Sequence, residues 1–181
     1  MKKSILSLLC VASLSFAMNL EDGTKAFESK DYKTALKVFE EFSLKGDASA
    51  QNNLGSMYYY GEGVEKDIKK AIEWYEKAAS QEDKKAETTI SAIKGDANAQ
   101  YELGDMYYYG EGYYYGEGVE KDYKKAFEWY EKAASQGYAD AQYSLGNMYK
   151  YGRGVEKDSK KAKKLFKEAC DGGHQDSCKL I

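Results

Sequence analysis

A pentapeptide that occurs three times constrains the fold of this chain more than any other feature of its sequence. Gly-Val-Glu-Lys-Asp occupies residues 63–67, 118–122 and 154–158. The last two copies are 36 residues apart, and the first two are 55 apart. Repetition with a period of roughly 20–50 residues indicates an array of similar units, because one such unit cannot bury its own apolar face and must stack on its neighbours. We therefore expect a repeat protein.

The longer interval contains 19 extra residues, which have two visible sources. Tyr-Tyr-Tyr-Gly-Glu-Gly stands twice in tandem, at 107–112 and 113–118, and the other 13 residues form an irregular insertion at 82–94. We expect the duplicated hexapeptide to lengthen a turn, because six residues added within a helix would rotate its buried stripe away from the core. The insertion is open to two interpretations. Lys84 to Lys94 resembles the second helix of a repeat without its first, or it extends the preceding helix.

Each repeat predicts a first helix with an apolar stripe and a central glycine. Leu54, Met57 and Tyr58 have the i, i+3, i+4 spacing of one buried helix face. A glycine in a helix interior costs about 1 kcal/mol relative to alanine, so we expect these glycines to permit the close approach of a neighbouring helix. They are Gly55, Gly104 and Gly146.

A second helix follows a glycine-containing turn in each repeat. An aspartate stands at its expected N-cap, where a carboxylate can accept a hydrogen bond from an otherwise unpaired backbone amide. The apolar face of this helix in the first clear repeat consists of Ala71, Trp74, Tyr75 and Ala78, and Glu and Lys occupy most other positions. The predicted N-caps are Asp67, Asp122 and Asp158.

The composition supports helices and excludes several classes of protein. The 181 residues include no proline, and Ala, Lys and Glu, which favour helices, recur throughout. With 43% hydrophobic and 31% charged residues, the chain is too apolar for a disordered tail and too polar for a polytopic membrane protein. Its net charge of −3 argues against nucleic-acid binding, which needs a basic face.

The first seventeen residues have the character of a signal peptide. Two lysines precede an apolar stretch from Ile5 to Phe16, and Ser15-Phe16-Ala17 forms a small-x-small cleavage site. The apolar stretch is too short for a transmembrane helix, so we expect no stable membrane insertion. The sequence therefore predicts a signal peptide at 1–17 and a periplasmic or secreted protein after cleavage near Ala17.

Two cysteines, Cys170 and Cys178, remain after this cleavage. An even number of cysteines in an exported protein favours a disulfide. In the repeat register Cys170 ends a second helix and Cys178 begins the next first helix, so the two ends lie side by side. A redox-active pair usually has Cys-x-x-Cys spacing, and a closed zinc site needs four ligands, whereas His174 is the only histidine. We expect a structural disulfide, no metal and no cofactor.

The repeats together resemble a known family. Their shared pattern, Leu-Gly-x-Met-Tyr-x-x-Gly-x-Gly-Val-x-x-Asp-x-x-Lys-Ala-x-x-Trp-Tyr-x-Lys-Ala-Ala, is similar to the Sel1-like repeat, a relative of the tetratricopeptide repeat. The resemblance covers roughly residues 20–181 and implies an all-α fold, a right-handed α/α superhelix (solenoid) of helix pairs. The implied organisation of residues 18–181 is a divergent first unit at 20–49, repeats at about 50–85, 99–135 and 141–173, and a terminal stub at 176–181.

The Cys-x7-Cys spacing is similar to that of the Helicobacter-type cysteine-rich proteins, secreted Sel1-repeat proteins with one such bridge in each repeat. Members of that group are described as penicillin-binding proteins or β-lactamases. Ser91-Ala92-Ile93-Lys94 fits the Ser-x-x-Lys element of serine β-lactamases, but the Ser-Asp-Asn and Lys-Thr-Gly elements do not occur. β-Lactam binding or hydrolysis, with Ser91 and Lys94 as weak catalytic candidates, is therefore an alternative, and we favour a protein without catalysis.

A binding surface for a protein or peptide partner of unknown identity is the stronger hypothesis. By analogy with the family, the first helices line the groove of the solenoid. Their positions that packing does not need carry tyrosine, amides and carboxylates, and tyrosine buries a large area at low entropic cost while keeping a polar tip. The alternative, that several tyrosines pack between the units, stays open for Tyr60, Tyr109 and Tyr151, and the oligomeric state stays open too. The predicted surface comprises Asn53, Ser56, Tyr59, Tyr60, Glu102, Asp105, Tyr108, Tyr109, Asn147, Lys150 and Tyr151.

Overall fold

The computed structural model describes residues 18–110 and 121–181, so the predicted signal peptide at 1–17 and the whole second hexapeptide copy at 113–118 lie outside the described residues. The described residues form ten α-helices and no strand. The helices are α1 (Leu20–Glu28), α2 (Tyr32–Leu44), α3 (Ala48–Tyr60), α4 (Ile68–Ala79), α5 (Lys84–Ile93), α6 (Ala97–Tyr109), α7 (Tyr123–Ser135), α8 (Ala139–Tyr151), α9 (Ser159–Asp171) and α10 (Gln175–Cys178).

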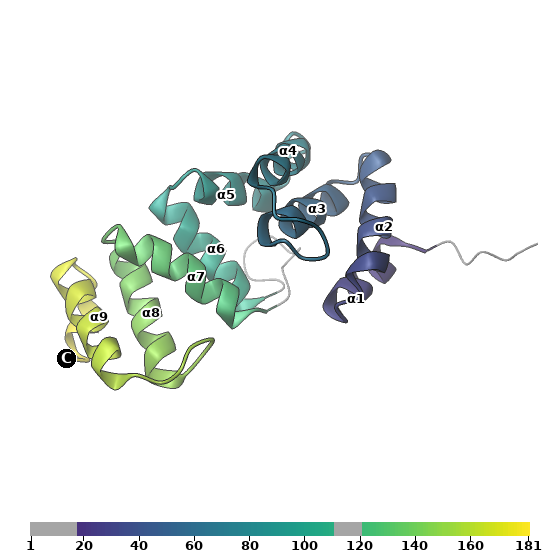
Figure 1. Cartoon of the computed structure of the whole chain (residues 1–181). Helices are drawn as coiled ribbons and strands as arrows, with labels where there is room; N and C mark the ends of the chain where they lie inside the picture. Colours follow the sequence, from purple (N-terminus) through teal and green to yellow (C-terminus); the bar gives the residue numbers. More distant parts are fainter. Residues whose placement is uncertain (1–17, 111–120) are drawn as a thin grey trace, which may run out of the picture.

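The helices pack as consecutive pairs, α1/α2, α3/α4, α6/α7 and α8/α9. We call the first helix of each pair helix A and the second helix B. Figure 1 shows the pairs in one curved array, with α1 and α2 at one end, α9 at the other and α5 between the second and third pairs. The all-α solenoid predicted from the sequence is therefore confirmed. No helix within residues 18–110 and 121–181 is long and apolar enough to cross a membrane.

In the three pairs that follow the repeat pattern, an aromatic ring of helix B packs directly against a glycine of helix A. A Cβ atom added to any of these glycines would lie under 3 Å from a buried ring, a contact that real side chains do not make. The predicted close approach of the neighbouring helix is therefore confirmed, and the approaching group is a ring. The pairs are Gly55–Tyr75, Gly104–Tyr130 and Gly146–Phe166, with nearest Cβ-to-ring distances of 2.7, 2.5 and 2.7 Å.

The turn between helix A and helix B is closed by one backbone hydrogen bond in each of these pairs. The amide of the N-cap aspartate of helix B donates to a tyrosine carbonyl near the end of helix A, and the aspartate carboxylate accepts from the first turn of helix B, as predicted. Residues 61–67 and 152–158 separate the two helices in two of these pairs, whereas residues 110–122, six more in number, separate α6 from α7. The six extra residues therefore fall between α6 and α7, and both helices keep the register of the other pairs. The second copy of the hexapeptide, which we expect to lengthen the turn, itself lies outside the described residues. The amide-to-carbonyl pairs are Asp67–Tyr58, Asp122–Tyr107 and Asp158–Tyr149, at 2.9, 2.8 and 3.0 Å.

The irregular insertion forms a separate helix, α5, which begins like a helix A. Glu82 has a φ of 65°, which a helix cannot continue through, so α5 does not extend α4. Asp83 caps α5 by accepting a hydrogen bond from the Ala86 amide at 2.9 Å. The same cap, an aspartate three residues before a buried alanine, begins α3 and α6. On one of the two interpretations, this segment resembles the second helix of a repeat, but its start is that of a helix A. Only its C-terminal end, described next, resembles a helix B.

A glutamine near the start of helix A joins the pairs α3/α4, α6/α7 and α8/α9 to the helix before each of them. Its side-chain amide donates to a backbone carbonyl eight residues earlier, at or near the end of the preceding helix. Because α5 supplies this carbonyl to α6, α5 ends as a helix B does. The pairs are Gln51–Ser43, Gln100–Ala92 and Gln142–Ala134, at 3.4, 3.1 and 3.4 Å.

The predicted disulfide between Cys170 and Cys178 is present and joins the same two repeat positions at the end of the array. Cys178 stands where the other repeats have the glutamine, and Cys170 stands where they have the accepting carbonyl, again with a separation of 8 residues. A covalent bond thus replaces a hydrogen bond in holding α10 against α9. Closing so short a loop stabilises a fold by about 2–3 kcal/mol on the chain-entropy estimate.

We expect Gly146→Ala to lower the free energy of unfolding by about 1–3 kcal/mol, the usual cost of overpacking a filled core. Alanine is otherwise favoured over glycine in a helix, so the loss would come from the clash with the Phe166 ring. Chemical denaturation of the oxidised protein measures the change. In Gly146→Ala/Phe166→Leu part of the loss should return, because leucine leaves room for the methyl group. A single variant as stable as the wild type would contradict this account of the glycine.

Candidate functional site

The predicted binding-surface residues divide into two groups in the structure. One group contacts other side chains of the array and comprises Ser56, Tyr59, Tyr60 and Asp105. The other lies at the C-terminal ends of α6 and α8, where Tyr109, Lys150 and Tyr151 are exposed and Tyr108 is half-buried. Asn53, Glu102 and Asn147 are half-buried. Glu102 accepts a hydrogen bond from Asn98 one turn earlier at 2.9 Å. The first group therefore belongs mainly to the scaffold.

Ser56 and Asp105 lie at one repeat position, and each holds the hydroxyl of a buried tyrosine. Ser56 Oγ is 3.1 Å from Tyr75 Oη, and the Tyr130 hydroxyl donates to Asp105 Oδ1 at 2.5 Å. Asp105 is only 3% exposed, so its side chain lies inside the helix pair and not on its surface. Burial raises the pKa of the Asp105 carboxyl, and hydrogen bonds from Tyr130 and Tyr101 partly oppose that shift.

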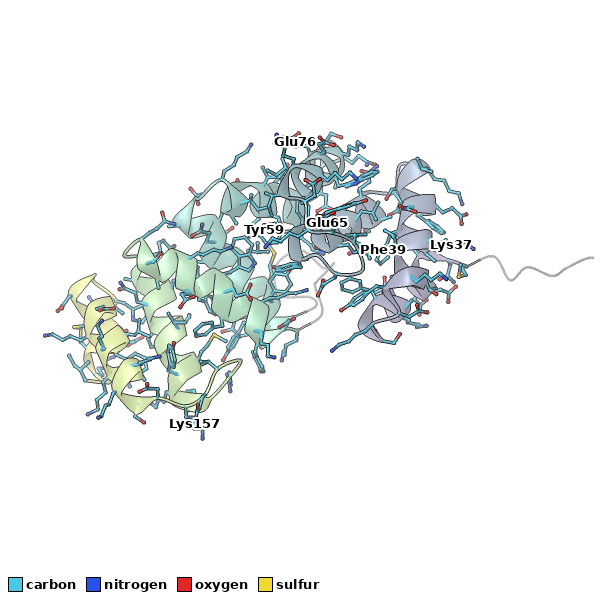
Figure 2. The ribbon with its side chains drawn as sticks, viewed as in Figure 1. Lys37, Phe39, Tyr59, Glu65, Glu76 and Lys157 are labelled. Carbon is cyan, nitrogen blue, oxygen red and sulfur yellow. A yellow bond between two sulfur atoms is a disulfide. The ribbon has the colours of Figure 1, made fainter. Side chains whose placement is uncertain are left out.

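Tyr59 and Tyr60 join α3 to α7, and Figure 2 shows Tyr59 in the middle of the array. The Tyr59 ring stacks on the Trp129 indole with centroids 5.5 Å apart, and Trp129 Nε1–H donates to the Tyr60 hydroxyl at 2.8 Å. Lys132 Nζ lies 3.7 Å from the Trp129 ring centroid and donates to the Tyr59 hydroxyl at 2.8 Å. Burial raises the pKa of Tyr60 well above its ordinary value. These two tyrosines therefore act as contacts between repeats.

Lys125 on α7 forms an ion pair with Glu62, which lies in the turn after α3. Lys125 Nζ is 3.0 Å from the carboxylate, and the two side chains are 16% and 23% exposed. The same Nζ lies 4.1 Å from the Tyr60 ring centroid, and 5.9 and 5.8 Å from those of Phe27 and Tyr107. A partly desolvated cation attracts the faces of such rings. Lys125 thus ties α1, α3, α6 and α7 together.

The exposed group is organised around Arg153, in the turn after α8. Its guanidinium carbon lies 5.4, 5.9 and 5.5 Å from the ring centroids of Tyr108, Tyr123 and Tyr151, and it also donates a hydrogen bond to the Tyr108 hydroxyl. Tyr109 packs edge-to-face against Tyr108. Tyr109 and Tyr151 are 48% and 52% exposed. We call these five residues the tyrosine–arginine surface.

Two members of this surface, Arg153 and Tyr123, were not predicted. Arg153 is the only arginine of the chain, and the corresponding residue of the first clear repeat is Glu62. Tyr123 begins α7, where α4 begins with Ile68. Both are departures from the other repeats, and this comparison could have identified them. Lys150, which was predicted, is exposed beside the surface, with its Nζ 5.4 Å from the Tyr151 ring centroid.

The two weak catalytic candidates lie at the end of α5. Ser91 is exposed in the last turn, and Lys94 is the exposed C-cap of the helix. A lysine that activates a nucleophile does so from a desolvated or electrostatically tuned position, which this helix end does not provide. His174 caps α10 through Nδ1, 3.2 Å from the Ser177 amide, and stacks on Tyr143. No three His, Cys, Asp or Glu side chains in the described part of the chain are grouped to hold a metal ion.

We expect Asp105→Asn to stabilise the protein at neutral pH, because an amide oxygen can still accept from Tyr130 while the buried charge is removed. The raised pKa means that Asp105 keeps its proton to a higher pH in the folded protein than in the unfolded chain, where its carboxyl has the ordinary pKa of 3.8. The contribution of the Asp105 carboxyl to the free energy of unfolding of the wild type therefore falls as the pH rises above about 4. The difference in Tm between variant and wild type should widen from pH about 4 to neutrality.

Thermal denaturation across this pH range measures the effect. Glu76→Gln is the control, because Glu76 is an exposed carboxylate that projects from the outer side of α4 (Figure 2). A Tm difference for Asp105→Asn that does not change with pH, or that matches the control, would contradict the assignment of a buried charge.

The repeats match the model of a known protein family. The Sel1 repeat family matches residues 48–83, 97–138 and 139–174. A 78-residue stretch is 36% identical to HcpC of Helicobacter pylori strain J99, a protein named as a proposed beta-lactamase, and this stretch covers 38% of the present chain and 27% of HcpC. The chain therefore matches only about a quarter of the length of that relative.

Two solved structures are also similar. A Sel1 repeat protein from Oxalobacter formigenes is 35% identical, with a TM-score of 0.45, over 81% of this chain and 96% of that one. The cysteine rich protein B of Helicobacter pylori is 24% identical, with a TM-score of 0.43, over 91% and 98% of the two chains. The three matched repeats leave out residues 84–96, which contain α5. Since they nevertheless span more than half of the sequence, the protein belongs to the Sel1 repeat family.

Proposed function

We propose that this protein is an exported scaffold that binds a protein or peptide partner through the tyrosine–arginine surface and Lys150. The Sel1 repeat is a scaffold for protein–protein interaction, which supports a binding role. The observation that carries the proposal is the exposure of Tyr109 and Tyr151, 48% and 52%, next to an arginine. Tyrosine and arginine are enriched among the residues that contribute most to binding free energy at interfaces.

The arrangement of Arg153 also favours binding. Its guanidinium is already held against three tyrosine rings, so little side-chain freedom remains to be lost when a partner docks. The tyrosine hydroxyls and the guanidinium supply hydrogen-bonding groups around the aromatic area. Tyr59 and Tyr60 on α3, by comparison, lie in the middle of the array, and their hydroxyls bond to Lys132 and Trp129 of α7. The partner surface that we propose is therefore displaced from α3 toward the ends of α6 and α8.

Export is part of the proposal and has two supports. Residues 1–17 have the positive start, apolar stretch and small-x-small end of a signal peptide. The disulfide between Cys170 and Cys178 is of a kind that persists in oxidising compartments such as the periplasm or the extracellular space. Cleavage near Ala17 would release the solenoid into either compartment.

Site-specific photocrosslinking in the producing cells tests the binding surface. We expect a benzophenone amino acid placed at Tyr109 or Tyr151 to capture one discrete partner, because these side chains would lie inside the interface. The same group placed at Glu76, on the outer side of α4, is the matched control and should capture none. In a chain that carries the crosslinker at Lys150, Arg153→Ala should reduce the yield several-fold, since an interface arginine commonly contributes over 1 kcal/mol. Equal capture at all positions would refute the surface.

The resemblance to HcpC supplies the alternative, a β-lactam-binding protein or β-lactamase. Ser91 and Lys94 would be its candidate residues, although both are exposed at the end of α5. We expect the purified, oxidised protein not to hydrolyse a chromogenic cephalosporin. Ser91→Ala serves as the control for any turnover that is seen. Turnover that the wild type shows and the variant loses would establish the alternative and overturn the non-catalytic part of the proposal.

A further inference from the structure

We propose that the outer face of α9 binds the surface of an anionic phospholipid bilayer. This face carries four lysines, Lys160, Lys163, Lys164 and Lys167, and we call it the lysine face. The proposal does not depend on the tyrosine–arginine surface, which lies at other positions of the array.

The four lysines form one continuous stripe on the helix. Their spacing of three and four residues places them on the same side, and all four are exposed. The opposite side of α9 is buried in the array and contains Ala162, Phe166 and Ala169. The stripe extends along about 10 Å of helix, given a rise of 1.5 Å per residue, so several lipid headgroups could lie against it.

The other B helices of the same chain show that this stripe is a departure. The repeat register places Lys164 and Lys167 where α4 and α7 have exposed glutamates, and it places Lys163 where they have an apolar residue. The buried face keeps the alanine–ring–alanine order in all three helices. Only the outer face of α9 therefore differs, and its charge is reversed. The residues at the three compared positions are Ile72, Glu73 and Glu76 on α4, and Phe127, Glu128 and Glu131 on α7.

Helix stability does not account for this reversal. Lysines three and four residues apart repel one another on a helix surface, so the stripe of four lysines opposes helix formation. On α4 and α7 the first glutamate instead stands four residues after a lysine, Lys69 or Lys124, which offsets part of the like-charge repulsion there. Lys164 does pair with Glu168 at 3.6 Å, but both side chains are exposed, 77% and 41%. Such surface pairs are weak, and this one has the less favourable order of basic residue before acidic. An external anion would relieve the repulsion.

The composition of the face favours a bilayer over an acidic protein. Protein interfaces depend on a few aromatic or arginine anchors that fill pockets, and the exposed stripe, which ends at Asp171, contains neither an aromatic residue nor an arginine. Lysine is a mobile point charge, which suits the diffuse negative potential of a lipid surface. A cluster of four or more basic residues on a helix is the pattern that binds anionic lipid.

The position of α9 leaves this face accessible. Figure 1 shows α9 at the end of the array opposite α1 and α2. Lys157, in the turn before α9, is also exposed and projects away from the helices (Figure 2). The net charge of the whole chain is −3, so attraction to a negative surface would come from this local group and not from the overall charge. The array would contact the bilayer by its C-terminal end.

Sedimentation with lipid vesicles tests the proposal, using the oxidised chain without residues 1–17. We expect binding to vesicles of equal parts phosphatidylglycerol and phosphatidylcholine at low salt, and none to pure phosphatidylcholine. Binding should disappear at about 1 M salt, where the screening length falls to about 3 Å. The triple variant Lys163→Gln/Lys164→Gln/Lys167→Gln should bind about 100-fold more weakly, because each lysine near an anionic surface contributes a factor of about five.

The matched control removes the same number of charges elsewhere. Lys33→Gln/Lys37→Gln/Lys124→Gln changes exposed lysines on α2 and α7 and should bind vesicles as the wild type does. All chains must show the same Tm, which excludes unfolding as the cause. Equal loss in both triple variants, no binding to anionic vesicles, or binding of poly-glutamate in place of vesicles would overturn the proposal, and the last result would indicate an acidic protein as the partner of α9.

Discussion

The fold depends on the contact between a helix A glycine and a helix B ring. Glycine lowers helix stability by about 1 kcal/mol, but it lets a buried aromatic side chain lie directly on the backbone of the neighbouring helix. Burial of one large side chain contributes about 1.5–3 kcal/mol, which offsets that cost. The same contact has a polar requirement, since a tyrosine hydroxyl at this place needs a partner. Ser56 and Asp105, each directly after the glycine, provide it, and the third pair has Phe166, which needs none.

The joints between repeats follow from a second recurring contact. A glutamine side chain satisfies a carbonyl at the end of the preceding helix, and in two repeats a further glutamine, Gln81 or Gln136, donates to it. At the end of the array Gly172 takes the place of this further glutamine, and Gln142 Oε1 is buried without a hydrogen-bond partner. At the next junction, between α9 and α10, the Cys170–Cys178 disulfide replaces the glutamine contact. The C-terminal end is therefore held covalently where its hydrogen bonding is poorest.

Local features were predictable from the sequence, and contacts across the insertion were not. The N-cap aspartates, the central glycines and the disulfide each involve residues within one repeat or one joint, so repeat spacing was enough to identify them. α5 begins like a helix A and ends like a helix B, and this could be predicted only by comparing both of its ends with the other repeats. Tyr59 and Tyr60 contact Trp129 about 70 residues later. Where such residues meet depends on how α5 orients the pairs on either side of it, and the repeat pattern contains no information about that.

Tyr60, Tyr109 and Tyr151 illustrate why repeat position alone does not decide function. All three end a helix A, yet Tyr60 is held by Trp129, whereas Tyr109 and Tyr151 remain about half exposed. The difference lies in the neighbours and not in the tyrosines. For the same reason Arg153, which stands where the first clear repeat has Glu62, gathers three rings around it.

The scaffold fixes glycine, alanine and ring positions so tightly that new chemistry can enter only at outward positions. On this chain the outward departures gather in its last pair, α8/α9, as one arginine among tyrosines and a row of lysines in place of glutamates. A uniform repeat protein would present the same surface in every unit. Here the earlier pairs keep the acidic surface and the internal tethers, and the last pair carries the surfaces that differ. Binding specificity in such an array is therefore to be sought where a repeat stops resembling its neighbours.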